Sequence, residues 1–144
     1  FLDLRGRVPD AHVMLQEEVA RRIASPPGSK EYGILSVLFA LWADVSIVLR
    51  FPPGAFLPPP KVHSAVIRIR FREEPAVRLT LPDSFPALVA RAFAQRRRTL
   101  ENNLQDSYPN LKEHLRLLNI EGSRRAETLS VVEFGRLANA LAGE

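Results

Sequence analysis

The densest cluster of one charge in the chain is the run of three arginines Arg96, Arg97 and Arg98, with Arg91 close by. A guanidinium donates hydrogen bonds in a planar fork that matches phosphate oxygens, so such a cluster favours a polyanion partner. Successive residues of a helix point about 100° apart, which prevents all three from facing one ligand. We expect one or two to contact phosphates and one to pair with Glu101 or to cover a helix flank. The alternative interpretation is a solvated charged face.

An aromatic ring and a lysine form a second candidate site in a proline-rich segment. Five of the nine residues from Pro52 to Pro60 are proline, which excludes a helix or a central strand and predicts a stiff loop. Phe56 lies inside this loop, and on the pattern alone we interpret it as a core aromatic that closes a sheet. Lys61 follows the prolines directly, where a phosphate contact and a solvated surface lysine are equally good interpretations.

Other kinds of catalytic or metal site find little support. The chain has no cysteine, which excludes disulfides and thiolate ligands. The three histidines, His12, His63 and His114, are far apart in the sequence and have no second ligand at metal spacing, so we expect no metal site. Glu17 and Glu18 are adjacent and diverge on a helix, so they form no acid–base pair, although they suit the start of a helix.

The composition is that of a folded chain with a basic bias. Of 144 residues 46% are hydrophobic, and the longest apolar-rich stretch, Ile34 to Ala43, is half the roughly 20 residues that a membrane helix needs. The net charge of +4 comes from residues 1–72, where ten Lys and Arg stand against six Asp and Glu, because residues 73–144 hold ten of each. The first residue is Phe1 and not methionine, which predicts that the chain begins at an interior cut.

Residues 1–72 have the pattern of a partial α/β sheet. The predicted elements are a short apolar segment at 11–15, helices at 16–24 and about 32–42, and strands at 45–51 and 64–71. In the last strand Ala65, Ile67 and Ile69 share one face. The proline-rich loop is too short for a helical crossover, so the last two strands should be antiparallel neighbours.

After Phe71 the pattern changes to helices. Apolar residues recur at helical spacing in the stretches 88–104, 111–118 and 134–141. Ser130, with Glu133 three residues later, predicts a capping box at the start of the last helix. The predicted fold class is therefore α/β followed by all-α.

We divide the chain near residues 72–82 into an α/β part, residues 1–72, and a small helical domain, residues 73–144. A sheet of two or three strands leaves an edge unpaired and apolar surface exposed. We expect the chain either to pair this edge with another chain or to be only marginally stable alone.

Five segments resemble motifs of the rRNA adenine N6,N6-dimethyltransferase family. Residues 14–20 are similar to its M-L-Q-x-E-V-A motif and residues 27–37 to P-G-S-K-x-Y-G-x-L-S-V. Residues 52–66 resemble P-P-x-x-F-x-P-x-P-K-V-x-S-A-V, and residues 92–100 resemble A-F-x-Q-R-R-K-T-L. Residues 125–130, Arg-Ala-Glu-Thr-Leu-Ser, also fit. The segments occur in family order and span nearly the whole chain.

The resemblance implies that residues 1–72 are the C-terminal strands and helices of a Rossmann-like methyltransferase sheet, followed by a helical RNA-binding domain. It also implies an upstream half with a Gly-rich loop that holds S-adenosylmethionine and with an Asn-Leu-Pro-Tyr catalytic motif. Neither motif occurs in this chain. We therefore expect the parent protein to be an enzyme, and this chain alone to bind no cofactor and to be inactive. The alternative is a non-catalytic RNA-binding or ribosome-assembly module.

The family transfers two methyl groups from S-adenosylmethionine to N6 of adenines in small-subunit rRNA. Because the exocyclic amine is a poor nucleophile, catalysis depends on flipping the base out and holding the amine in line with the methyl group. The resemblance implies that Phe56 stacks on the flipped base and that Lys61, Arg96, Arg97 and Arg98 bind RNA.

The resemblance also implies partners and a location. We expect small-subunit rRNA or a pre-30S-type particle as the substrate, no membrane association, and a cytoplasmic protein. The open sheet edge should pair with another copy of the chain or with the missing N-terminal half.

Overall fold

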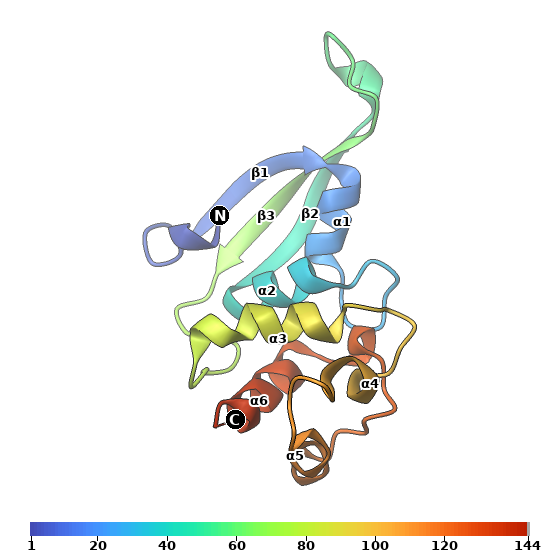
Figure 1. The fold of residues 1–144 in the computed structure, drawn as a ribbon. Helices are drawn as coiled ribbons and strands as arrows, with labels where there is room; N and C mark the ends of the chain where they lie inside the picture. Colours follow the sequence, from blue (N-terminus) through green and yellow to red (C-terminus); the bar gives the residue numbers. More distant parts are fainter. Residues whose placement is uncertain (144) are drawn as a thin grey trace.

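A three-stranded sheet forms the first part of the computed structural model, which describes residues 1–143. The strands are β1 (Asp10–Gln16), β2 (Ala43–Phe51) and β3 (Ser64–Phe71), and their order in the sheet is β1-β3-β2. β3 is antiparallel to both neighbours, so the predicted antiparallel pair is confirmed. β1 and β2 are the edges of the sheet within residues 1–143 (Figure 1).

Two helices cover one face of this sheet because its strands alternate between apolar and polar residues. Ala65, Ile67 and Ile69 of β3 are fully buried and pack with residues of α1 (Glu17–Ala24) and α2 (Ile34–Trp42). On the opposite face Met14 and Leu49 are about half exposed, at 53% and 54%. The sheet is therefore packed on one side only within the described residues.

Four α-helices make up the second part, below the sheet in Figure 1. They are α3 (Phe85–Ala92), α4 (Leu100–Leu104), α5 (Leu111–Leu118) and α6 (Val131–Leu141). Ser130 and Glu133 form the predicted capping box at the start of α6. Short 3-10 turns occur at Leu2–Leu4, Pro53–Ala55, Pro82–Ser84 and Ala126–Thr128.

Helix α2 is shared between two hydrophobic cores. Val37 and Leu41 are buried in the core of the helical part, whereas Phe39 is buried against the sheet. The two parts of the chain are therefore joined through one helix and not only through the connection between β3 and α3. Among residues 1–143, no helix has the length and apolarity needed to cross a bilayer.

The connection from β3 to α3 is held closely against both parts. The amide of Ala76 donates to the carbonyl of Leu41 at the end of α2 (2.8 Å). Further along, the side-chain oxygen of Asn139 in α6 accepts a hydrogen bond from the amide of Thr80 (2.8 Å). Gly135 of α6 lies directly against Val77, where a Cβ atom would come within 2.0 Å of Val77 Cγ1.

Candidate nucleic-acid interface

The three arginines lie in the connection between α3 and α4. They are not helical, because α3 ends at Ala92 and a new helix begins after Thr99. The Thr99 hydroxyl oxygen accepts a hydrogen bond from the amide of Asn102 (3.2 Å), which caps α4. All three arginines are exposed, and the direction of each side chain is set by the turn and not by a helical repeat.

Arg96 binds groups from distant parts of the chain. Its guanidinium donates to the carbonyls of Tyr32 (3.0 Å) and Lys30 (3.1 Å) and to Oε2 of Glu127 (3.2 Å). Of the two alternatives predicted for one arginine of this cluster, pairing with Glu101 is wrong, since the carboxylate of Glu101 pairs instead with an exposed lysine of α5, at 3.3 Å. The turn after α3 directs Arg96 toward the segment before α2, away from α4.

The Arg96 contacts belong to a larger junction between the segment before α2 and the helical part. The amide of Gly28 donates to the carbonyl of Glu127 (2.7 Å), and the hydroxyl of Tyr32 donates to the carbonyl of Leu129 (2.7 Å). Burial raises the pKa of Tyr32 to about 12, so this hydroxyl stays neutral and remains a donor. The junction therefore fixes residues 28–32 from several directions.

Arg97 differs from its two neighbours because its side chain has no hydrogen-bond or ion-pair partner within residues 1–143. Arg98 donates to the carbonyl of Asn102 (3.1 Å) and stays exposed. Arg125 is also exposed, and its side chain contacts no acidic group among the described residues. It lies in the neighbouring segment, since the amide of Leu100 donates to the carbonyl of Arg124 (2.7 Å).

Sequence reasoning did not single out Arg125 as a binding residue. The only available signal was its place at the start of the segment 125–130. Its nearness to the arginine cluster depends on a contact between segments more than 20 residues apart, which no local spacing indicates.

Phe56 lies in the connection between β2 and β3, which projects from the sheet at the end away from helices α3 to α6 (Figure 1). Its ring is partly buried and packs edge-to-face on Phe51, with ring centroids 6.0 Å apart. The next residue, Leu57, is 97% exposed. Phe56 belongs to neither hydrophobic core, so the interpretation as a core aromatic is wrong. The ring is held from one side and partly open on the other.

Lys61 is exposed at the base of the same connection and has no ion-pair partner within residues 1–143. It borders a hollow of 290 Å³ at the start of α1, together with Glu17 and Arg21. Glu17 already pairs with Arg21 (2.7 Å) and Arg50 (3.2 Å). The Lys61 charge is therefore available to an external anion.

The structure does not bring Phe56 and the arginine cluster together. The connection that carries Phe56 leaves one end of the sheet, and the turn that carries Arg97 lies beside the helical part (Figure 1). The eight residues of β3 alone span about 26 Å at roughly 3.3 Å per residue. A ligand that contacts both regions at once would have to span a distance of this order.

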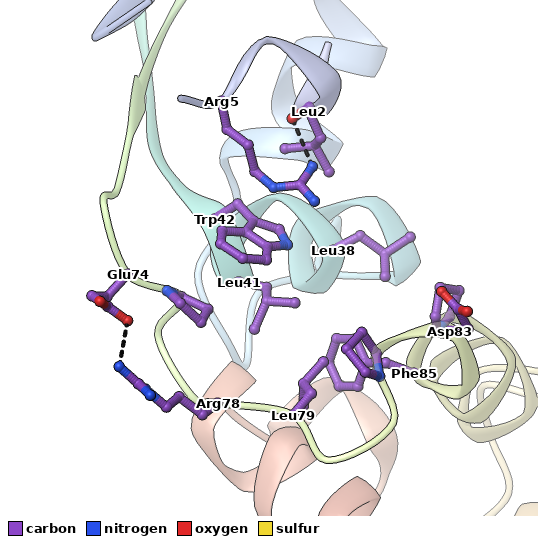
Figure 2. Close-up of a pocket in the computed structure, with 13 residues that line it drawn as sticks. Leu2, Arg5, Leu38, Leu41, Trp42, Glu74, Arg78, Leu79, Asp83 and Phe85 are labelled. Carbon is purple, nitrogen blue, oxygen red and sulfur yellow. Dashed lines mark hydrogen bonds and ion pairs between the residues drawn. The ribbon is translucent and has the colours of Figure 1, made fainter. Parts of the chain in front are cut away.

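A mainly apolar cavity lies elsewhere, beside Trp42 (Figure 2). It has a volume of 570 Å³ and is bordered by Leu38, Leu79 and Phe85, with the Arg5 guanidinium 4.2 Å from the Trp42 ring centroid. The same lining also holds the carboxylates of Glu74 and Asp83, of which Glu74 pairs with Arg78 (3.0 Å), so its charges are of both signs. Within residues 1–143 no cluster of His, Asp or Glu could hold a metal ion.

A second large hollow, of 620 Å³, lies between α1 and the arginine turn. Its charged groups include Lys30 and Glu31, while Glu18 is paired with Arg22 (2.6 Å) and Arg96 with Glu127 (3.2 Å). The charges around this hollow therefore nearly balance and favour neither a cationic nor an anionic ligand.

Comparisons with known proteins agree with the motifs. A family model described as "Ribosomal RNA adenine dimethylase" matches residues 3–143. A ribosomal RNA small subunit methyltransferase A from Syntrophotalea carbinolica is 48% identical over 98% of this chain and 54% of its own length. A protein of the same name from Lysinibacillus sphaericus is 44% identical over 97% of this chain and 49% of its own length. The chain thus spans about half the length of the curated relatives it matches.

Two solved structures share the fold. A dimethyladenosine transferase from Plasmodium falciparum superposes with a TM-score of 0.76 at 23% identity, over 94% of this chain and 59% of that one. The 23S rRNA methyltransferase ErmE superposes with a TM-score of 0.64 at 22% identity, over 95% of this chain and 56% of that one. These two similarities concern the fold, whereas the family model, which covers nearly every residue, shows that the chain belongs to the ribosomal RNA adenine dimethylase family.

Proposed function

We propose that this chain is the C-terminal part of an S-adenosylmethionine-dependent enzyme that dimethylates N6 of adenines in small-subunit rRNA. The observation that carries the proposal is the family match over residues 3–143, together with 48% identity to a relative named as a small-subunit methyltransferase. In this proposal residues 1–72 belong to the methyltransferase sheet, and residues 73–144 form a helical domain that binds rRNA.

The proposed phosphate contacts are Arg97, Arg98 and Lys61. When an exposed cation that no carboxylate neutralises binds a phosphate, it displaces counterions that were condensed on the RNA. This release supplies affinity that does not depend on the RNA sequence. Arg97 and Lys61 have no acidic partner among the described residues. Arg98 donates one hydrogen bond to a carbonyl, which leaves its positive charge unneutralised. Arg125, which is exposed near the same turn, belongs to this proposed surface.

The proposed role of Phe56 is to stack on the flipped target adenine. Its ring is held by Phe51 and stands in a connection that projects from the sheet. The prolines around it fix the backbone in advance, which reduces the entropy lost when a base is bound. Stacking of a base on an aromatic ring contributes about 1–3 kcal/mol, enough to favour the flipped state of one nucleotide.

We assign cofactor binding and methyl transfer to the half of the relatives that this chain does not span. The relatives are about twice as long as this chain, and the Gly-rich loop and Asn-Leu-Pro-Tyr motif that the family resemblance implies do not occur in it. The unpaired edges of β1 and β2 and the half-exposed Met14 and Leu49 offer surface for that half of the protein. A second copy of the chain could pair with the same edges.

Calorimetry with two ligands tests this assignment. Titration of the chain with S-adenosylmethionine should produce no binding heat, whereas a small-subunit rRNA fragment should bind with an affinity that falls steeply as salt increases. Saturable binding of S-adenosylmethionine would contradict the assignment of the cofactor site. Absence of rRNA binding at low salt would contradict the proposed RNA surface.

A further inference from the structure

Arg96 joins three segments that are distant in the sequence. Its two amino groups donate to the carbonyls of Lys30 and Tyr32 and to the carboxylate of Glu127. Three of the five N–H donors of the guanidinium are thus used inside the protein. Its guanidinium carbon also lies 5.7 Å from the ring centroid of Phe93 at the end of α3.

The charge of Arg96 is already neutralised. Its amino group lies 3.2 Å from a carboxylate oxygen of Glu127, and the Glu127 side chain is only 29% exposed. A phosphate that approached Arg96 would be repelled by Glu127 and would have to break internal hydrogen bonds. Arg97, the next residue, carries the same charge without an acidic partner among the described residues.

We infer that Arg96 is a positioning residue that pins residues 28–32 against the turn between α3 and α4, while Arg97 makes the phosphate contact. The phosphate contact of Arg97 rests on the proposed rRNA binding. The positioning role of Arg96 rests on the internal contacts alone. Through this junction Arg96 fixes the spacing between two cations on different segments, Lys30 and Arg97. The spacing matters because phosphates are held at fixed intervals along an RNA backbone.

A lysine cannot replace Arg96 in this role. The acceptors surround two separate amino groups, Nη1 and Nη2, which a planar guanidinium presents in a rigid fork. A lysine ammonium is a single donor atom and cannot reach all of them, although it keeps the positive charge. The variant Arg96→Lys therefore separates positioning from charge.

Amide hydrogen exchange and RNA affinity in four variants test the inference. The variants are Arg96→Lys, Arg96→Ala, Arg97→Lys and Arg97→Ala, each compared with the unaltered chain. Exchange at the Gly28 amide, which donates to Glu127, reports on the junction without RNA. The dependence of rRNA affinity on salt counts phosphate contacts, at about 0.7–0.9 in log–log slope for each contact.

The junction predicts opposite patterns for the two arginines. In both Arg96 variants the Gly28 amide hydrogen should exchange at least about tenfold faster, the factor expected for loss of a charged hydrogen bond. Both variants should also bind RNA more weakly, with an unchanged slope of log affinity against log salt. Arg97→Ala should reduce the slope by about one contact and leave Gly28 unchanged, and Arg97→Lys should restore the slope.

Two results would overturn the inference. One is a reduced salt slope in Arg96→Ala with full RNA affinity in Arg96→Lys, which would make Arg96 a phosphate contact. The other is unchanged Gly28 exchange in both Arg96 variants, which would remove the junction. Should the unaltered chain bind no RNA, the proposed function fails, and the exchange measurement still decides whether Arg96 positions residues 28–32. If Arg96→Ala does not fold, Gly28 exchange and RNA affinity are both measured in Arg96→Lys alone.

Discussion

The substitution Gly135→Ala tests how the connection between the two parts of the chain is packed. Gly135 is buried in α6, and a Cβ atom there would lie 2.0 Å from Val77 Cγ1 and 2.9 Å from both Val77 Cβ and Cγ2. Because three carbons of Val77 are this close, rotation of its side chain cannot relieve the overlap. Either α6 or the 72–84 connection has to move by more than about 1 Å to restore van der Waals contact.

Two opposing effects decide how much Gly135→Ala changes the free energy of unfolding. Alanine in a helix is favoured over glycine by about 1 kcal/mol. Overpacking of a filled core costs about 1–3 kcal/mol and sometimes more, and the 2.0 Å approach belongs at the upper end. We therefore expect Gly135→Ala to lower the free energy of unfolding by about 2 kcal/mol net, which corresponds to a fall in Tm of about 6 °C for a chain of this size.

Urea denaturation of a double-mutant cycle with Val77→Ala measures the effect. Val77→Ala removes the two Cγ atoms that overlap most, so Gly135→Ala should cost at least about 1 kcal/mol less in that background. Equal costs in both backgrounds, or a stabilised Gly135→Ala single variant, would refute the close packing of the connection on α6.

Three further predictions follow from individual contacts. Tyr32→Phe removes the hydrogen bond that the buried hydroxyl donates to the main chain and should lower the free energy of unfolding by about 1–2 kcal/mol in urea denaturation. The hydrogen bond from Arg124 holds the pKa of Glu133 below its ordinary value of 4.5, so the unfolded chain binds more protons there and stability should fall as pH drops below about 4.5. Glu133→Gln should make stability less sensitive to pH in that window, and an unchanged profile would remove this role. In the proposed full-length enzyme, Phe56→Ala should reduce turnover about tenfold or more while changing RNA affinity little, with Leu57→Ala as the matched exposed control.

Local periodicity in the sequence was enough to predict most elements of the sheet part. The strand predicted at 64–71 is β3 (Ser64–Phe71), and the helix predicted at 16–24 is α1 (Glu17–Ala24), because both are amphipathic with a clear repeat. The pairing of β2 with β3 followed from their short connection, but the position of β1 beside β3 was not predictable, because two helices and β2 separate these strands in the sequence. The apolar segment at 11–15 became an edge strand only through pairing with β3.

In the candidate site, too, local motifs could be predicted from the sequence, whereas contacts between distant segments could not. The arginine cluster and Phe56 were visible as motifs, and Thr99, a good N-cap residue, could have indicated that the arginines lie before a new helix. The partner of Arg96 was not visible, because Glu127 is 31 residues away in the sequence. The separation of Phe56 from the cluster also depends on the tertiary arrangement.

The central claim, that this chain supplies the rRNA-binding part and the other half of the relatives supplies the cofactor site, is tested most directly by reconstitution. The chain would be mixed with the amino-terminal half of the Syntrophotalea carbinolica relative, and transfer of labelled methyl groups from S-adenosylmethionine to small-subunit rRNA would be measured. We predict transfer to adenine N6 when both pieces are present and none with this chain alone. Transfer by this chain alone, or an amino-terminal half that is as active without it as with it, would contradict the account.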